Sequence, residues 1–258
     1  MPPVIIDIGV GSIRTYTLAL ALGMLITALL FMRKLERGRR TRAVDALLLA
    51  LALALALARV EHVLLNWAYF ADNLDEILLL SAGGLGWHGT VLGALGGLWI
   101  GWRLRLHPSP FSQFQEFIDA LALGVPALML AAWFGCWSAG CGYGYEVATL
   151  ADYPSPIAAE LPDTYGVIVP RLNTPLFGMA WAVLVLVLFV AWQVRQRSGR
   201  FWLLLALVSL GMFLIGFVRA DSVPVAFGLR VDQVLDMIIC GSSAICLMRT
   251  HPESKTDS

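Results

Sequence analysis

The stretch Ser81-Ala82-Gly83-Gly84-Leu85-Gly86-Trp87-His88-Gly89-Thr90 decides how the chain folds. It lies inside a hydrophobic run over residues 77–102, which is long enough to cross a bilayer. Its glycines weaken a helix, because glycine loses the most backbone freedom on ordering. Non-helical backbone at membrane depth must be surrounded by protein or line a water-filled cavity, which satisfies its polar groups. The ionisable His88 in this break predicts a functional site facing a polar interior. A packing seam of small residues that holds a structural histidine is the alternative.

The composition places the chain among integral membrane proteins. Of its 258 residues 59% are hydrophobic and 14% are charged, and the mean hydropathy is +0.76. We therefore predict an all-α integral membrane protein with a single membrane domain over 1–258. The net charge of zero indicates no partner by itself, and no feature supports nucleic-acid binding. The cysteines are too few and too scattered for a disulfide framework or a paired zinc site: Cys136, Cys141, Cys240 and Cys246.

Seven apolar runs predict seven transmembrane helices, at residues 13–32, 43–65, 77–102, 114–134, 174–192, 201–218 and 231–248. The first run has no small-residue cleavage site after it, which is typical of a retained span rather than a signal peptide. The basic loop that follows it is expected in the cytoplasm. The N-terminus is then outside and the C-terminus inside, with an external loop at 135–173 and a cytoplasmic tail at 249–258. No internal repeat is visible, which disfavours a secondary transporter.

Polar and ionisable residues gather in the outer half of these spans. With a rise of about 1.5 Å per residue, Arg59 lies about 24 Å from the inner end of its span and His88 about 16 Å below the outer surface, so the two can meet. His62 shares a helix face with Arg59, and Glu61 is expected to point elsewhere. The other polar groups expected on this side are Tyr16, Cys136, Cys141, Arg219, Asp221, Arg230, Asp232 and Asp236.

This cluster predicts a polar chamber open to the outer leaflet. Guanidinium groups in such a chamber suit an anionic headgroup, because they offer forked donors to phosphate oxygens. The alternative is that Arg59, Arg219 and Arg230 form structural ion pairs with the carboxylates nearby or extend to the surface.

Cys136 and Cys141 lie in a glycine-rich segment that is expected outside the membrane. They can form a disulfide in an oxidising compartment, since the glycines let the chain turn. A thiol nucleophile is the alternative, and it requires a base or cation that folding brings close. The C-x4-C spacing alone is a weak signal for either.

These features together resemble the prolipoprotein diacylglyceryl transferase family over nearly the whole chain. Residues Gly83-Gly84-Leu85-Gly86-Trp87-His88-Gly89 are similar to the family's Gly-Gly-x-x-x-His-Gly element, and Ala58-Arg59-Val60 to its arginine in the second span. The other similar segments are Tyr16 in the first span, Asp163-Thr164-Tyr165-Gly166 with Pro170-Arg171 and Pro175 before the fifth, Phe217-Val218-Arg219 with Asp221 at the end of the sixth, and Asp232-Gln233 at the start of the last.

The resemblance implies a transferase of lipoprotein biosynthesis in the bacterial cytoplasmic (inner) membrane. It would move a diacylglyceryl group from phosphatidylglycerol to the lipobox cysteine thiol of a prolipoprotein, leaving a thioether and glycerol phosphate. His88 and Tyr16 would be catalytic, with His88 as the base or as a hydrogen-bonding partner. The residues implied in substrate binding are Arg59, Arg219, Arg171, Gly84 and Gly89. No metal or organic cofactor is implied.

The chain departs from the family signature Gly-Arg-x-Gly-Asn-Phe-x-Asn-x-Glu, which falls on residues 132–141. Trp133 stands at its arginine, Cys136 at its first asparagine and Cys141 at its glutamate. The family's glutamate in the fifth span falls near Gly178, and its arginine within the sixth falls near Met212. Two alternatives therefore stay open: a non-catalytic relative that binds anionic lipid or serves as a scaffold, and a transferase in which a cysteine attacks.

Overall fold

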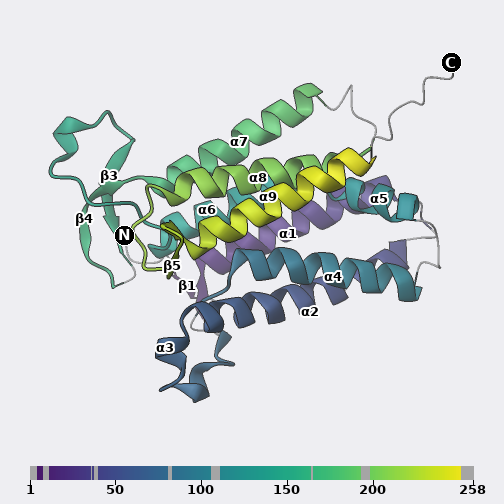
Figure 1. The fold of residues 1–258 in the computed structure, drawn as a ribbon, viewed down its shortest axis with the longest axis horizontal. Helices are drawn as coiled ribbons and strands as arrows, with labels where there is room; N and C mark the ends of the chain where they lie inside the picture. Colours follow the sequence, from purple (N-terminus) through teal and green to yellow (C-terminus); the bar gives the residue numbers. More distant parts are fainter. Residues whose placement is uncertain are drawn as a thin grey trace. The chain divides into compact units, whose positions relative to one another are not determined.

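Helices make up most of the fold (Figure 1). The computed structural model describes residues 5–7, 12–35, 37, 40–80, 83–105, 111–163, 165–192 and 198–250. The α-helices in these ranges are α1 Thr15–Lys34, α2 Arg40–Leu65, α3 Trp67–Phe70, α4 Trp87–Arg105, α5 Phe111–Ala120, α6 Gly124–Ala139, α7 Thr174–Trp192, α8 Arg200–Gly216 and α9 Val231–Thr250. Two short 3-10 helices, η2 Leu74–Glu76 and η4 Leu150–Asp152, lie in the loops. The predicted helical fold is confirmed in this coarse form.

Two-stranded antiparallel hairpins accompany the helices. They pair β1 Ile5–Asp7 with β2 Ser12–Arg14, β3 Ala158–Pro162 with β4 Ile168–Leu172, and β5 Val225–Ala226 with β6 Leu229–Arg230. The prediction of an all-α fold missed these strands. Strands of two to five residues are too short to show the alternating pattern by which a strand is recognised in sequence.

Several helices can cross a bilayer, so the chain is a multi-pass membrane protein. Among the described residues, four helical segments are long and apolar enough: α1, Ala43–Leu65 of α2, Thr174–Ala191 of α7, and α9. A fifth span is possible if Phe114–Ala120 and Gly124–Ala139 are counted together, although a bend of 42° separates them. α8 is apolar but has 17 residues. The predicted number of seven spans stays a prediction.

The glycine-rich stretch contains the start of a helix instead of interrupting one. Residues 77–86 are not α-helical where they are described, and α4 begins only at Trp87. Gly83 and Gly84 have φ values of +87° and +77°, which side chains rarely adopt. The prediction of a broken helix over 77–102 was therefore wrong about where the helix starts. Ser81 and Ala82 lie outside the described residues.

The contacts divide the chain into two compact units, each described by itself. In the larger unit, which comprises Met1–Phe31, Ile118–Ser222 and Asp236–Ser258, α7 packs against α6 and α8 (Figure 1). The buried Asp119 carboxylate caps the N-terminus of α8. It accepts hydrogen bonds from the N–H groups of Gly199 (2.9 Å) and Phe201 (2.8 Å). These N–H groups have no partner within the helix, so Asp119 stabilises its start.

In the smaller unit, which comprises Met32–Phe117 and Val223–Leu235, α2 and α4 lie side by side (Figure 1). The two helices meet along small residues spaced four apart. Cβ atoms built on four glycines of α4, spaced four apart, would lie 2.2–2.7 Å from α2 atoms, so no larger residue fits there. The facing glycines and alanines, called here the Gly/Ala seam, are Gly89, Gly93, Gly97 and Gly101 on α4 and Ala46, Ala50, Ala54 and Ala58 on α2. Such small-residue contacts are the usual way in which membrane helices approach closely.

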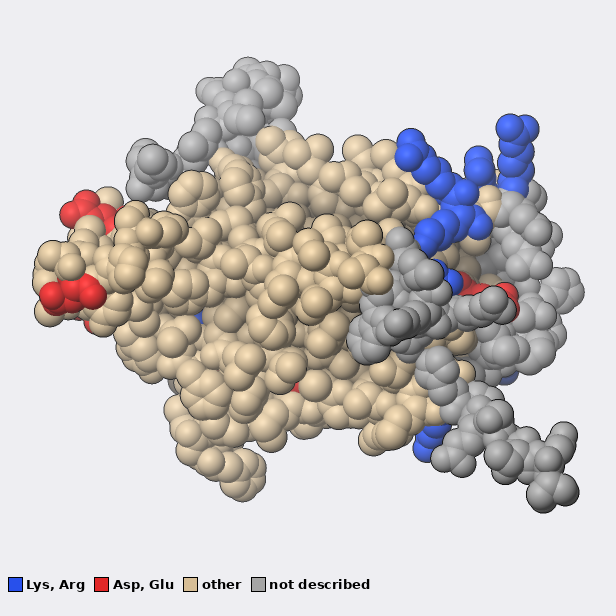
Figure 2. Space-filling view, turned by 90° about the horizontal axis from the view of Figure 1, so that it is seen from above, with Lys and Arg blue, Asp and Glu red and all other residues tan. Residues whose placement is uncertain are grey.

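Most of the surface seen in Figure 2 is formed by residues other than Lys, Arg, Asp and Glu (tan). A group of basic side chains (blue) and several acidic side chains (red) are visible on it. The last turn of α1 carries Arg33 and Lys34, and that of α9 carries Arg249. The orientation in the membrane stays a prediction. Three predicted inner-loop arginines, Arg39, Arg195 and Arg197, and the tail beyond residue 250 lie outside the described residues.

Candidate active site

The loop before α4 is wrapped around the side chain of Arg59. Its guanidinium donates hydrogen bonds to the carbonyl oxygens of Ile77 (2.7 Å), Gly83 (2.7 Å), Gly84 (3.2 Å) and Glu76 (2.6 Å). Arg59 is only 6% exposed. A buried carbonyl without a partner is costly, so one arginine satisfies much of a segment that forms no α-helix.

This geometry changes the interpretation of Arg59. The sequence predicts Arg59 as a phosphate-binding residue, whereas the structure directs its donors to backbone oxygens. The guanidinium also lies over the ring of Phe70, 5.2 Å from its centre. Arg59 therefore holds the loop that leads into His88.

Tyr69 of α3 and Glu76 of η2 form a tyrosine–carboxylate pair. The Tyr69 hydroxyl donates a hydrogen bond to the Glu76 carboxylate, at 2.7 Å. This bond raises the pKa of Tyr69, because it stabilises the protonated hydroxyl. The backbone carbonyl of Glu76 is one of the Arg59 acceptors, so the pair lies next to the Arg59 contacts.

His88, in the first turn of α4, pairs with Glu61 of α2. The distance from His88 Nδ1 to Glu61 Oε1 is 2.6 Å, and the two side chains are 4% and 12% exposed. The other carboxylate oxygen, Oε2, accepts a hydrogen bond of 2.6 Å from the Gly89 N–H. Glu61 thus uses both oxygens at the start of α4, where the helix dipole also favours negative charge.

Glycines make room for this pair. A Cβ on Gly86 would lie 2.0 Å from Glu61 Oε2, and a Cβ on Gly89 would lie 2.2 Å from the Leu57 carbonyl oxygen. A Cβ on Gly84 would lie 2.3 Å from the His62 ring. Packing therefore already explains the absence of a side chain at Gly84 and Gly89. Their predicted role in substrate binding stays a prediction.

Sequence reasoning missed Glu61. The three-residue spacing of Arg59 and His62 places those two residues on one helix face and predicts that Glu61 points elsewhere. This prediction was wrong, because Glu61 contacts His88. A signal was present, because a carboxylate inside an apolar span is costly and is usually kept for a function.

The other two predicted headgroup arginines also have protein partners. Arg219 is paired with Asp221 through two hydrogen bonds, Nε to Oδ1 at 2.9 Å and Nη2 to Oδ2 at 2.5 Å. Arg171 is 4% exposed, and its Nη2 lies 3.0 Å from Glu146 Oε1 and 3.2 Å from Asp163 Oδ2. These contacts match the alternative of structural ion pairs.

Tyr16 and Arg230 complete the predicted cluster. The ring of Tyr16 packs on Gly135, where a Cβ would lie 2.6 Å from Tyr16 Cδ2. Arg230 is paired with Asp232, with 3.0 Å between Nη2 and Oδ2. The predicted chamber draws on residues of both units and stays a prediction. Within the described ranges, no three His, Cys, Asp or Glu side chains come together as metal ligands.

The chain matches the family model described as prolipoprotein diacylglyceryl transferase over residues 3–249. The chain belongs to this family. A relative from Streptococcus agalactiae, named phosphatidylglycerol–prolipoprotein diacylglyceryl transferase, is 29% identical over 249 residues, or 92% of this chain and 91% of the relative. Relatives of the same name come from Nocardia farcinica (29% over 250 residues, 90% of this chain, 50% of the relative) and Clostridium novyi (26% over 265 residues, 99% and 98%).

A departure from the diacylglyceryl transferase signature, Trp133, contacts Gly178, which departs from the family's pattern in the predicted fifth span. Trp133 of α6, 5% exposed, packs its indole on Gly178 of α7. A Cβ on Gly178 would lie 2.3 Å from the indole ring, so the large residue fits only because its neighbour has no side chain. An apolar contact thus stands where the resemblance in sequence implies an arginine and, nearby, a glutamate.

Two further departures form a disulfide, as one of the two readings of the sequence predicts. Cys136 and Cys141 are bonded, with 4.7 Å between their Cα atoms. The bond joins the last turn of α6 to the residue after its left-handed cap, Gly140. Because a bonded sulfur is no nucleophile at rest, a catalytic thiol at either position is disfavoured.

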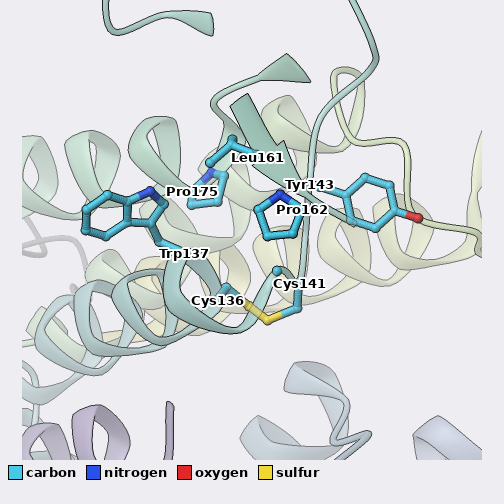
Figure 3. Close-up of a pocket in the computed structure, with 8 residues that line it drawn as sticks. Cys136, Trp137, Cys141, Tyr143, Leu161, Pro162 and Pro175 are labelled. Atoms are coloured by element: carbon cyan, nitrogen blue, oxygen red, sulfur yellow. A yellow bond between two sulfur atoms is a disulfide. The ribbon is translucent and has the colours of Figure 1, made fainter. Parts of the chain in front are cut away.

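A small pocket lies beside this disulfide (Figure 3). Trp137, Pro162 and Pro175 gather on one side of it, and the sulfur atoms lie at its edge. Its volume is about 10 Å³, enough for about one water molecule. The signature region of this diacylglyceryl transferase relative is therefore closely packed and leaves no room here for a lipid headgroup.

Proposed function

We propose that the protein transfers a diacylglyceryl group from phosphatidylglycerol to the cysteine thiol of a prolipoprotein. The observation that carries the proposal is the buried Glu61–His88 pair in the glycine–histidine element of a chain that belongs to this family. The names of the relatives support the same donor lipid and acceptor protein. We further propose seven spans in the bacterial cytoplasmic membrane, with the N-terminus outside and the C-terminus inside.

The chemistry follows from what an imidazole can do. His88 takes the thiol proton, and the sulfur electron pair forms a bond to the glyceryl carbon that carries the phosphate ester. The carbon–oxygen bond breaks, its electron pair leaves with glycerol phosphate, and His88 passes the proton to the departing phosphate or to water. The products are a thioether and glycerol phosphate.

The leaving phosphate needs positive charge or hydrogen-bond donors around it. Among the arginines predicted to bind substrate we assign Arg219 to this role, because its side chain is 16% exposed, whereas that of Arg171 is 5% exposed and Arg59 is buried. Tyr16 stays a candidate donor.

A transfer assay tests the proposal. Purified protein is mixed with phosphatidylglycerol labelled in its headgroup glycerol and with a lipobox peptide that bears one cysteine. We expect release of labelled glycerol phosphate together with a diacylglyceryl mass gain on the peptide. His88→Ala should abolish both while the protein stays folded. Full activity of His88→Ala would remove His88 from the mechanism.

A second candidate function is a lipid-binding relative without turnover. The packing of Trp133 on Gly178 and the disulfide at Cys136 and Cys141 favour it, because they put groups that cannot hold a phosphate where the resemblance implies polar or charged residues. Folded wild-type protein that binds phosphatidylglycerol vesicles but releases no glycerol phosphate over hours would establish this candidate and refute the transferase.

A further inference from the structure

We propose that Glu61 is the positioning residue of the active site: it fixes the orientation and the protonated nitrogen of His88. The inference rests on the proposed transferase function. Glu61 lies outside the family signature, which falls on residues 132–141.

The first step is the placement of the proton on the imidazole. An ionised carboxylate only accepts hydrogen bonds, so the 2.6 Å contact requires the hydrogen on His88 Nδ1. In the neutral ring the other nitrogen, Nε2, then carries the lone pair that accepts a proton. The carboxylate also stabilises the imidazolium that forms when His88 takes the thiol proton, as in other histidine–carboxylate pairs.

The second step is the rigidity of the carboxylate. Glu61 Oε2 is held by the Gly89 N–H at 2.6 Å, so the side chain is fixed at both oxygens. The missing Cβ of Gly86 leaves the space that the carboxylate fills. The Gly86 N–H donates to the Ala58 carbonyl at 2.9 Å, which ties the start of α4 to α2 one turn before Glu61.

The third step separates this role from a purely structural one. A carboxylate at a helix start stabilises the helix through the Gly89 N–H whether or not His88 reacts. Glu61→Gln distinguishes the two roles. Its single carbonyl oxygen keeps the Gly89 bond, and its NH2 group then faces His88 Nδ1, which must accept. The proton moves to Nε2, and His88 loses its function as a base.

The test compares Glu61→Gln with wild type in the transfer assay at two pH values. At pH 7 we expect kcat to fall about 100-fold, within the range that general-base catalysis contributes. Above pH 9 a thiol with an ordinary pKa of about 8.5 is already ionised, so the deficit should shrink to a few-fold. Glu116→Gln, the same change on an exposed helical glutamate of the same unit, should have the kcat of the wild type at both pH values. An equal loss of Glu61→Gln at both pH values would overturn the inference.

A readout without turnover keeps this test separate from the proposed function. Nitrogen-15 NMR of histidine-labelled protein reports which ring nitrogen is protonated, and His88→Gln identifies the His88 signals. We expect protonated Nδ1 in the wild type and protonated Nε2 in Glu61→Gln. The same tautomer in both would overturn the inference. If the wild type shows no transfer and the tautomer still changes, the transferase proposal fails while the positioning of His88 by Glu61 stands.

Discussion

Arg59→Lys decides whether Arg59 supports the loop or binds lipid. The guanidinium reaches carbonyl oxygens of Ile77, Gly83, Gly84 and Glu76 from three nitrogen atoms. A lysine presents its donors from one atom, so it cannot reach all these oxygens together, and it keeps the positive charge.

The magnitude follows from the bonds that are lost. A hydrogen bond to a charged group contributes about 1.5–3 kcal/mol, and losing two of the four gives about 3–6 kcal/mol of unfolding free energy. Water entering the loop recovers part of this, so we expect the lower half of the range. The matched control is Arg219→Lys. Its ion pair with Asp221 is partly exposed, so the loss should stay below about 1 kcal/mol.

The assay has two parts. Unfolding of both variants in mixed detergent gives the change in stability, and limited proteolysis shows whether residues 71–86 become accessible. The transfer assay then gives KM for phosphatidylglycerol at a temperature where Arg59→Lys is folded. We expect lower stability, cleavage in the loop and a KM close to that of the wild type. Wild-type stability combined with a KM raised tenfold or more would refute the reasoning and restore Arg59 as a lipid-binding residue.

Three further predictions concern the larger unit. Gly178→Ala places a methyl group against the indole of Trp133 and should lower the free energy of unfolding by about 2–3 kcal/mol, measured in detergent. Adding Trp133→Leu to this variant should recover most of the lost stability, and no recovery would contradict the contact. Alkylation of denatured, unreduced protein should label only the two free cysteines and spare Cys136 and Cys141, as mass spectrometry would show. Asp119→Ala removes the cap of α8 and should cost about 1–2 kcal/mol, while an unchanged melting temperature would argue against the cap.

Apolar length predicts the membrane helices well where the helix is regular. The span predicted at 174–192 has the bounds of α7, Thr174–Trp192. The span predicted at 114–134 is divided between α5 and α6 with a bend of 42°, because Leu121 to Leu123 form turns that hydropathy does not register. Hydropathy likewise does not show that residues 77–86 are not α-helical. Their conformation depends on the Arg59 side chain, which donates hydrogen bonds to backbone carbonyl oxygens there.

The site is predicted only in part. His88 and Arg59 are identified from the cost of burying an ionisable group, and the structure places them in the same unit. Glu61 is missed, because its contact with His88 depends on how closely two helices approach, which one sequence does not reveal. The sequence predicts the disulfide only as one of two alternatives, because the fold decides whether the sulfur atoms of Cys136 and Cys141 meet.

The Gly/Ala seam restricts how α4 can move along α2. Its small residues repeat every four positions, so the two backbones fit together only in steps of about 6 Å. A smaller displacement would drive the α4 backbone against the α2 methyl groups. A displacement by one full step would separate His88 from Glu61 beyond any hydrogen-bond distance. The pair is therefore either complete or absent, and any sliding motion of α4 would switch the base on or off without intermediate states.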